Sequence, residues 1–243
     1  MDTMLWKPSV ERIEHSQMMA FIKALNSEYE LDLKTYADLH AFSIQQKTEF
    51  WKFLITYFDV AYSGDLNPAL LEEGFDNYTW FTKVTLNSAE NYLKAGLDQN
   101  IAINFQHESG KNRTLTYREL KTDVKSLQTY LKTVMGVGDV LAAYMPNIPE
   151  TVISMLAATS MGGVFTSTSC DFGIEGVLDR FGQSNPKVLI AAVGYEYGEK
   201  YFDLQAKLIE IEKRIPSLEV IILVDFLGRG YDLSQFEKAI DYH

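Results

Sequence analysis

From residue 96 onward, short runs rich in β-branched and apolar residues alternate with longer amphipathic runs. This alternation is typical of a parallel sheet whose strands are connected by helices. Strands are predicted at residues 101–106, 114–116, 140–144, 164–167, 188–192 and 219–224. Helices are predicted at residues 117–135, 149–161, 174–184 and 200–214, with a last helix at 233–242. Right-handed crossovers place helices on both faces, so the expected fold class is α/β with a doubly wound, mostly parallel sheet.

The first part of the chain has a different pattern and is predicted to be an N-terminal helical cap. Apolar residues recur at helical spacing, which predicts helices over residues 11–29, 35–42 and 46–58. Residues 72–80 show neither helical nor strand periodicity and are expected to form an ordered loop. A short helix is expected up to Lys94, with Asn87 or Ser88 as its N-cap. We therefore predict two regions, a cap at residues 1–95 and an α/β region at 96–243.

Charge and composition exclude several classes of protein. The net charge of −11 makes nucleic acid an unfavourable partner. No apolar run approaches the roughly 18 residues of a membrane-spanning helix, and the N-terminus lacks the apolar stretch of a signal peptide, so a cytoplasmic protein without membrane insertion is expected. Cys170 is the single cysteine, which excludes an internal disulfide and a cysteine metal cage.

Four motifs, in this order along the chain, resemble those of one enzyme superfamily. Residues 6–8 read WKP, residues 115–120 read LTYREL, residues 138–147 read GDVLAAYMPN, and residues 170–173 read CDFG. In this order and separation they resemble the adenylate-forming acyl-CoA synthetases. Residues 86–93, LNSAENYL, narrow the resemblance to the short-chain branch. Within that branch, WKP and CDFG are similar to the members that activate acetoacetate.

The resemblance implies a two-step reaction. Acetoacetate would attack the α-phosphate of ATP to form an acyl-adenylate and pyrophosphate, and the thiolate of CoA would then displace AMP, with Mg²⁺ accompanying ATP. The superfamily's phosphate loop, adenine motif, acyl pocket and catalytic lysine would be expected after residue 242. The resemblance therefore implies that these 243 residues are an N-terminal fragment, inactive alone and binding no cofactor tightly.

The resemblance also implies candidate residues for binding the nucleotide end of CoA. In the acetate-activating members, a Phe-Gly-Gly turn and two arginines hold that group. An alignment without gaps places the turn on Ser169, Cys170 and Asp171, and the two arginines on Tyr197 and Lys200. Only Lys200 keeps a positive charge, while Asp171 and two nearby glutamates would repel a phosphate.

The residues around Cys170 also allow readings without a ligand. Asp171-Phe172-Gly173 spells the magnesium-binding tripeptide of protein kinases, but no other kinase motif accompanies it. The match to the kinase tripeptide is interpreted as coincidence, and a turn from strand to helix, with Asp171 or Gly173 beginning the helix at Ile174, is the preferred explanation. Cys170 is expected to be a small buried hydrophobic residue rather than a reactive thiol. The four histidines are scattered, so a catalytic triad has no support.

Several functions stay open. A ligase for another short acid, such as acetate or propionate, fits the same motifs. So does a self-contained α/β module that binds a mononucleotide or a partner protein without catalysis. A dehydrogenase of the Rossmann type is disfavoured, because no glycine-rich turn joins a strand to a helix. The oligomeric state cannot be predicted from these patterns.

Overall fold

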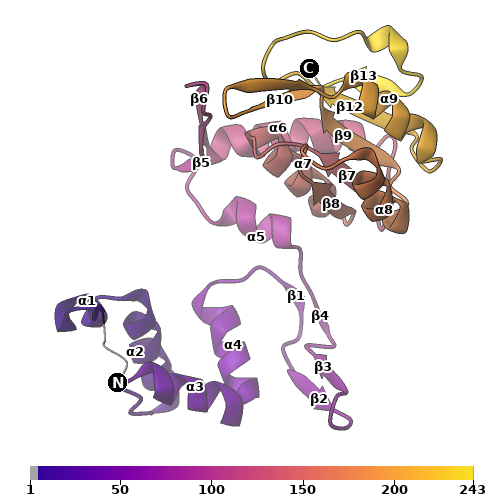
Figure 1. Cartoon of the computed structure of the whole chain (residues 1–243). Helices are drawn as coiled ribbons and strands as arrows, with labels where there is room; N and C mark the ends of the chain where they lie inside the picture. Colours follow the sequence, from indigo (N-terminus) through magenta and orange to yellow (C-terminus); the bar gives the residue numbers. More distant parts are fainter. Residues whose placement is uncertain (1–4, 243) are drawn as a thin grey trace. The chain divides into compact units, whose positions relative to one another are not determined.

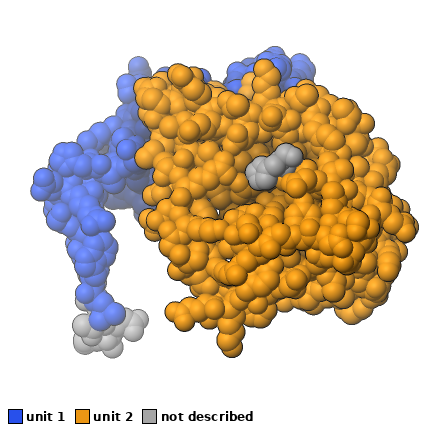
Figure 2. All heavy atoms as spheres, turned by 90° about the horizontal axis from the view of Figure 1, so that it is seen from above, with its two compact units in different colours: residues 1–86 blue, residues 87–243 orange. Residues whose placement is uncertain are grey.

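The computed structural model describes residues 5–242, and the chain divides into two compact units, residues 1–86 and 87–243 (Figure 2). Each unit is described by itself. The domain boundary predicted between residues 95 and 96 lies further along the chain than this division, and the predicted domain limits stay a prediction. None of the helices within residues 5–242 is both long and apolar enough to cross a membrane.

Within residues 5–86, the first unit is built on four helices, α1 (Val10–Glu14), α2 (Gln17–Tyr29), α3 (Tyr36–Gln45) and α4 (Lys47–Tyr57) (Figure 1). The single helix predicted over residues 11–29 is divided in two. The side chain of Ser16 accepts a hydrogen bond from the backbone N–H of Met19 and so starts a new helix. Phe21 of α2 lies edge-on to Phe53 and Tyr57 of α4, and these aromatic contacts join the helices.

Two small antiparallel pairs complete the first unit: β1 (Ser63–Gly64) with β4 (Val84–Thr85), and β2 (Leu70–Glu72) with β3 (Tyr78–Trp80). The prediction of an ordered loop over residues 72–80 is therefore wrong at both of its ends, where β2 and β3 form. The backbone N–H of Glu73 donates to the carbonyl of Asn77 at 3.0 Å and closes this hairpin. Strands of three residues are too short for a period of two to be visible in the sequence.

The second unit begins with α5 (Ser88–Lys94), whose N-cap is Asn87, one of the two residues predicted for that role. Strands β5 (Ile101–Gln106) and β6 (Asn112–Thr116) follow where they were predicted. They pair antiparallel with each other and form a separate hairpin instead of joining the parallel sheet. The prediction was wrong on this point, because a connection of five residues permits a hairpin but is too short for a parallel crossover.

The centre of the second unit is a five-stranded parallel sheet. Its strands are β7 (Val140–Tyr144), β8 (Val164–Thr168), β9 (Val188–Ala192), β12 (Val220–Val224) and β13 (Ala239–Asp241), in the order β13-β12-β9-β7-β8. All five residues of β9 are buried. A central strand covered on both faces has no polar alternation, which is how this segment reads in the sequence.

Helices cover both faces of the sheet, as predicted for a doubly wound fold (Figure 1). The helices are α6 (Tyr117–Leu131), α7 (Pro149–Ser160), α8 (Ile174–Ser184) and α9 (Gln205–Arg214). In the sheet, β8 lies on one side of β7, whereas β9 and β12 lie on the other side. The chain therefore crosses the sheet in one direction from β7 to β8 and in the opposite direction from β8 to β9 and β12. Right-handed crossovers then put α7 on one face and α8 and α9 on the opposite face. Helix α6 packs beside α7, and α8 packs beside α9.

The helix predicted over residues 200–214 begins later than expected. Its first four residues form β11 (Lys200–Asp203), which pairs antiparallel with β10 (Gly194–Tyr197). Gly198 and Glu199, between the strands, both have positive φ values, of 58° and 62°. This is the geometry of a tight two-residue hairpin turn. The carboxylate of Asp203 then accepts a hydrogen bond from the backbone N–H of Gln205, where α9 begins.

The helix predicted over residues 233–242 is wrong. Only a single 3₁₀ turn, η1 (Leu233–Gln235), forms there, and the chain continues into the edge strand β13. The carboxylate of Glu212 accepts hydrogen bonds from the backbone N–H groups of Glu237 and Lys238. This contact from α9 holds the chain extended ahead of β13, so tertiary contacts decide the conformation of this segment.

Candidate functional site

The order of the sheet reverses at β7, which has β8 on one side and β9 on the other. In open α/β sheets, ligands bind outside the carboxyl ends of the strands next to such a reversal. The loop of residues 169–173 follows β8, and the β10–β11 hairpin follows β9. The five predicted coenzyme-binding residues therefore all lie on segments that leave the carboxyl edge of the sheet.

The loop after β8 is held from inside the protein. The hydroxyl group of Tyr144, at the end of β7, lies 2.8 Å from the carbonyl oxygens of Cys170 and Phe172. Cys170 is 1% exposed, and its Sγ lies 3.7 Å from the carbonyl oxygen of Tyr144. Burial raises the pKa of the Cys170 thiol to about 12, with Asp171 adding to the effect. The thiol is therefore protonated and shielded, and it belongs to the packing of the loop.

Helix α8 begins directly after this loop, with Gly173 as N-cap. The prediction of a strand-to-helix turn at this motif is thus confirmed. No side chain caps this helix, so its first N–H groups could receive an anion. However, Asp171 is exposed beside them, and Glu175 lies in the first turn. These carboxylates make the start of α8 a poor place for a phosphate.

Tyr197 and Lys200 face each other at the far end of the β10–β11 hairpin. Tyr197 is 74% exposed. At the base of the hairpin, burial raises the pKa of Tyr195, and the nearby Cys170 and Asp171 add smaller contributions. Within the described residues, no hydrogen bond or ion pair joins Tyr197 or Lys200 to the loop of residues 169–173. The predicted residues therefore form two groups, and their role in binding stays a prediction.

The hairpin is fixed to the next loop along the carboxyl edge. Arg229, after β12, donates to the carboxylate of Glu196 at 2.9 Å. Its guanidinium also lies over the ring of Tyr201, 5.2 Å from the centroid. The carboxylate of Asp225 accepts hydrogen bonds from the backbone N–H groups of residues 228, 229 and 230, which shapes this loop. The elements carrying the candidate residues are thus fixed by polar contacts.

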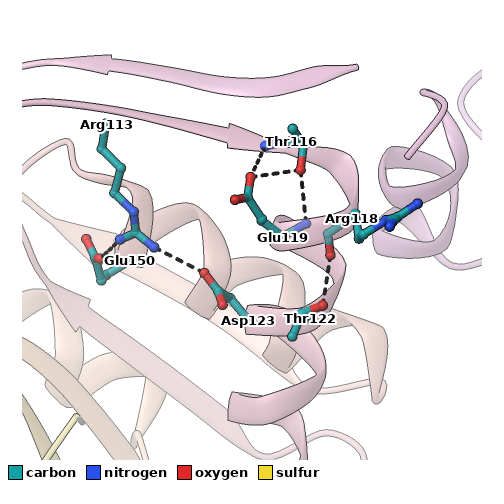
Figure 3. Close-up of polar contacts among 7 residues, drawn as sticks. All are labelled: Arg113, Thr116, Arg118, Glu119, Thr122, Asp123 and Glu150. Atoms are coloured by element: carbon teal, nitrogen blue, oxygen red, sulfur yellow. Dashed lines mark hydrogen bonds and ion pairs between the residues drawn. The ribbon is translucent and has the colours of Figure 1, made fainter. Parts of the chain in front are cut away.

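A cavity of about 490 Å³ lies on the face of the sheet that carries α6 and α7. Its residues come from five elements and from the position after β13, and they include Arg113, Asp123, Tyr130, Glu150, Ile222, Ile240 and Tyr242. Arg113 of β6 joins the carboxylates of Asp123 and Glu150 (Figure 3). The charged residues of this cavity come from β6, α6, α7 and β13 and have no motif in common, so the sequence alone did not predict it.

Cofactor chemistry has limited support from the side chains of this chain. No group of three or more His, Cys, Asp or Glu residues within residues 5–242 is arranged to hold a metal ion. Two cations of α6, Arg118 and Lys121, both lie beside Asp98, at 3.9 Å and 2.9 Å. Within the described residues, both of these cations are therefore already paired with a carboxylate.

Comparison with known proteins adds information about ancestry. Residues 95–241, more than half of the chain, match the family described as AMP-binding enzyme. The chain is 36% identical to acetoacetyl-coenzyme A synthetase of Rhizobium meliloti (strain 1021), over 90% of this chain and 34% of that protein. It is 29% identical to malonamoyl-CoA synthetase of Penicillium aethiopicum, over 92% of this chain and 32% of that protein.

A solved structure is also similar. Acetoacetyl-CoA synthetase from Streptomyces lividans matches with a TM-score of 0.91 and 32% sequence identity, over 99% of this chain and 37% of that one. This match supports the α/β fold with N-terminal helices. The chain spans about a third of the length of the relatives that it matches.

Proposed function

We propose that this chain, which belongs to the AMP-binding enzyme family, forms part of a ligase that activates acetoacetate with ATP. A carboxylate oxygen of acetoacetate attacks the α-phosphate, and pyrophosphate leaves with the electrons of the broken bond. The thiolate of CoA then attacks the acyl carbonyl, and AMP leaves. The observation that carries this proposal is the similarity to a solved acetoacetyl-CoA synthetase over 99% of the chain.

The 243 residues contribute part of this machinery, and we propose that they are inactive alone. Adenylate formation depends on donors and cations placed around the developing phosphate charge. Within residues 5–242 the candidate positions at the carboxyl edge carry Asp171 and the neighbouring Glu175, and Lys200 is the one cation among the five predicted residues. The remaining phosphate-binding groups, together with Mg²⁺, are proposed to belong to polypeptide outside this third.

A second acid is a specific alternative substrate. The chain is 29% identical, over 92% of its length, to a malonamoyl-CoA synthetase, a relative that is named for a different acyl group. Malonamate, acetate and propionate are therefore tested beside acetoacetate. We favour acetoacetate because the relative with 36% identity is named for it.

The test is ATP–pyrophosphate exchange, measured on the longest polypeptide that the gene encodes. We expect exchange that depends on acetoacetate and is slower with acetate, propionate or malonamate. The 243-residue chain assayed in parallel should give none. Selective exchange with another acid would contradict the substrate, and absence of exchange with every acid would favour a module without catalysis.

The coenzyme step has its own test. If CoA phosphates approach the loop after β8, Asp171→Asn should lower the KM for CoA about two- to fivefold, as expected for removing one exposed repulsive charge. The rate of pyrophosphate exchange should stay unchanged. Asp179→Asn, an exposed carboxylate on α8, is the matched control. Equal KM values for the two variants would place CoA elsewhere.

A further inference from the structure

The loop after β8 is held by its backbone, and the contact comes from Tyr144. The hydroxyl group of Tyr144 lies 2.8 Å from the carbonyl oxygens of Cys170 and Phe172. Tyr144 is fully buried at the end of β7. Both carbonyl groups therefore point inward, toward the buried phenol.

The direction of these two carbonyl groups fixes the direction of two N–H groups. In a trans peptide, the C=O of one residue and the N–H of the next residue point in opposite directions. The one cis peptide bond within the described residues precedes Pro68, so the peptide bonds of the loop are trans. The N–H groups of Asp171 and Gly173 therefore point outward, away from Tyr144.

Neither of these N–H groups has an acceptor in the chain. Within the described residues, the N–H groups of Asp171 and Gly173 donate no hydrogen bond, whereas that of Phe172 donates to the carbonyl of Ser169 at 3.2 Å. Asp171 and Gly173 are both exposed, and a Cβ added to Gly173 would meet no atom within 4 Å. The loop thus presents two free donors outside the carboxyl end of β8, where doubly wound sheets bind ligands.

The charges near the two donors select an uncharged acceptor. Asp171 carries a carboxylate itself, and Glu175 follows in the first turn of α8. These carboxylates repel a phosphate, but they do not oppose a carbonyl oxygen or a ring nitrogen in the same way. CoA carries both kinds of uncharged acceptor, the amide carbonyl groups of its pantetheine arm and the nitrogens of its adenine ring.

We infer that Tyr144 is a positioning residue for the coenzyme step, because it turns the N–H groups of Asp171 and Gly173 outward to bind an uncharged acceptor of CoA. The phenol does not touch the coenzyme and acts through the backbone of the loop. This inference rests on the proposed function, which supplies CoA as a substrate.

The first experiment removes one donor and keeps the shape of the loop. Gly173 has φ −69° and ψ 163°, and proline adopts this φ value, so Gly173→Pro deletes the N–H while the backbone conformation is kept. Gly173→Ala keeps the N–H, so the comparison of the two variants isolates the donor. In the longest polypeptide that the gene encodes, the KM for CoA should be about three- to tenfold higher for Gly173→Pro than for Gly173→Ala, as expected for one lost hydrogen bond.

The second experiment tests the positioning. Tyr144→Phe releases both carbonyl groups, so the peptide groups of the loop can rotate and the KM for CoA should rise about three- to tenfold. The KM for ATP and the rate of pyrophosphate exchange, a reaction without CoA, should keep their wild-type values. A general loss of structure would change all three. Tyr130→Phe, which removes a hydroxyl group from α6, should leave the KM for CoA unchanged.

Pantetheine, which lacks the nucleotide of CoA, identifies the acceptor. If Gly173→Pro weakens thioester formation with pantetheine as much as with CoA, the acceptor is an amide of the pantetheine arm. If it weakens the reaction with CoA alone, the acceptor is in the adenine ring.

The outcomes separate the inference from the proposed function. Equal KM values for CoA in the two Gly173 variants, or a rise in the KM for ATP as large as that for CoA, would overturn the inference and leave the ligase standing. Absence of exchange in the wild type would contradict the proposed function. The geometry has its own test in the 243-residue chain, where the amide protons of Asp171 and Gly173 should exchange freely and that of Phe172 more slowly. Protection of the first two amides would overturn the inference whatever the activity.

Discussion

Replacing Tyr144 by phenylalanine tests how the loop after β8 is held. Tyr144 is fully buried at the end of β7, and its hydroxyl group lies 2.8 Å from two carbonyl oxygens, those of Cys170 and Phe172. Phenylalanine keeps the ring and removes one oxygen atom. The substitution therefore changes the hydrogen bonding of the loop with little change in packing.

The expected cost follows from these two contacts. A hydrogen bond contributes about 0.5–1.5 kcal/mol net, and leaving a buried polar group without a partner costs about 1–3 kcal/mol. The single hydroxyl hydrogen serves two carbonyl groups, so the cost does not double. We expect Tyr144→Phe to lower the free energy of unfolding of the second unit by about 2 kcal/mol. With a urea m-value of about 2 kcal/mol/M, the midpoint should fall by about 1 M.

Urea unfolding followed by far-UV circular dichroism is the assay. The three tryptophans, Trp6, Trp51 and Trp80, all precede residue 87, so their fluorescence follows the first unit and serves as an internal reference. Tyr130→Phe is the matched control, because the hydroxyl of Tyr130 makes no hydrogen bond within the described residues. A midpoint shift under about 0.2 M for Tyr144→Phe, or equal shifts for both variants, would refute the reasoning.

Three further predictions concern other groups of the second unit. Because burial raises the pKa of Cys170 to about 12, the native thiol should react with a thiol reagent at pH 8 many times more slowly than in urea. The backbone N–H of Gly136 and the charge of Lys187 lower the pKa of Asp139 in the folded protein. The ionised carboxylate therefore stabilises the fold at a pH above its unfolded pKa of about 3.9. This stabilisation is lost as the pH falls through the lower pKa of the folded protein. Asp139→Asn should thus reduce the free energy of unfolding at pH 7 by less than about 1 kcal/mol, and in urea titrations its difference from wild type should shrink as the pH falls below the unfolded pKa. Gly194→Ala would place a Cβ within 2.7 Å of the Tyr201 ring, so it should lower the free energy of unfolding by about 1–3 kcal/mol. Faster amide exchange in β10 and β11 would report the displaced hairpin.

The central sheet could be predicted because its strands carry their own signal. Residues 188–192 form a continuous apolar run and become β9 with the predicted bounds, and residues 174–184 become α8 with the predicted bounds. Each segment buries a face that its own sequence displays. The edge strand β13 has no such signal, since Glu212 of α9 and strand β12 determine its conformation. Pairing partners that are distant in sequence decide such elements.

The β10–β11 hairpin was missed for a different reason. Its strands have four residues each, and its turn requires a glutamate, Glu199, with a positive φ value. Most residues avoid this conformation, so Gly198 alone was too weak a signal to predict a turn at this point. The contacts that organise the site are also non-local. Tyr144 and Cys170 are 26 residues apart, and Arg113 and Glu150 are 37 apart, so neither contact could be predicted from local spacing.

Helices α7 and α8 begin at the carboxyl edge of the sheet and carry acidic side chains in their first turns. α7 and α8 both start without a side-chain cap, and each has a glutamate in its first turn, Glu150 and Glu175. These carboxylates occupy the positive end of the helix dipole, where a phosphate would otherwise bind. An arginine from another element neutralises each one, Arg113 for Glu150 and Arg214 for Glu175. Because each of these carboxylates is paired with an arginine, we expect neither helix start to bind a phosphate strongly. A nucleotide added to this chain alone should therefore leave its urea midpoint unchanged.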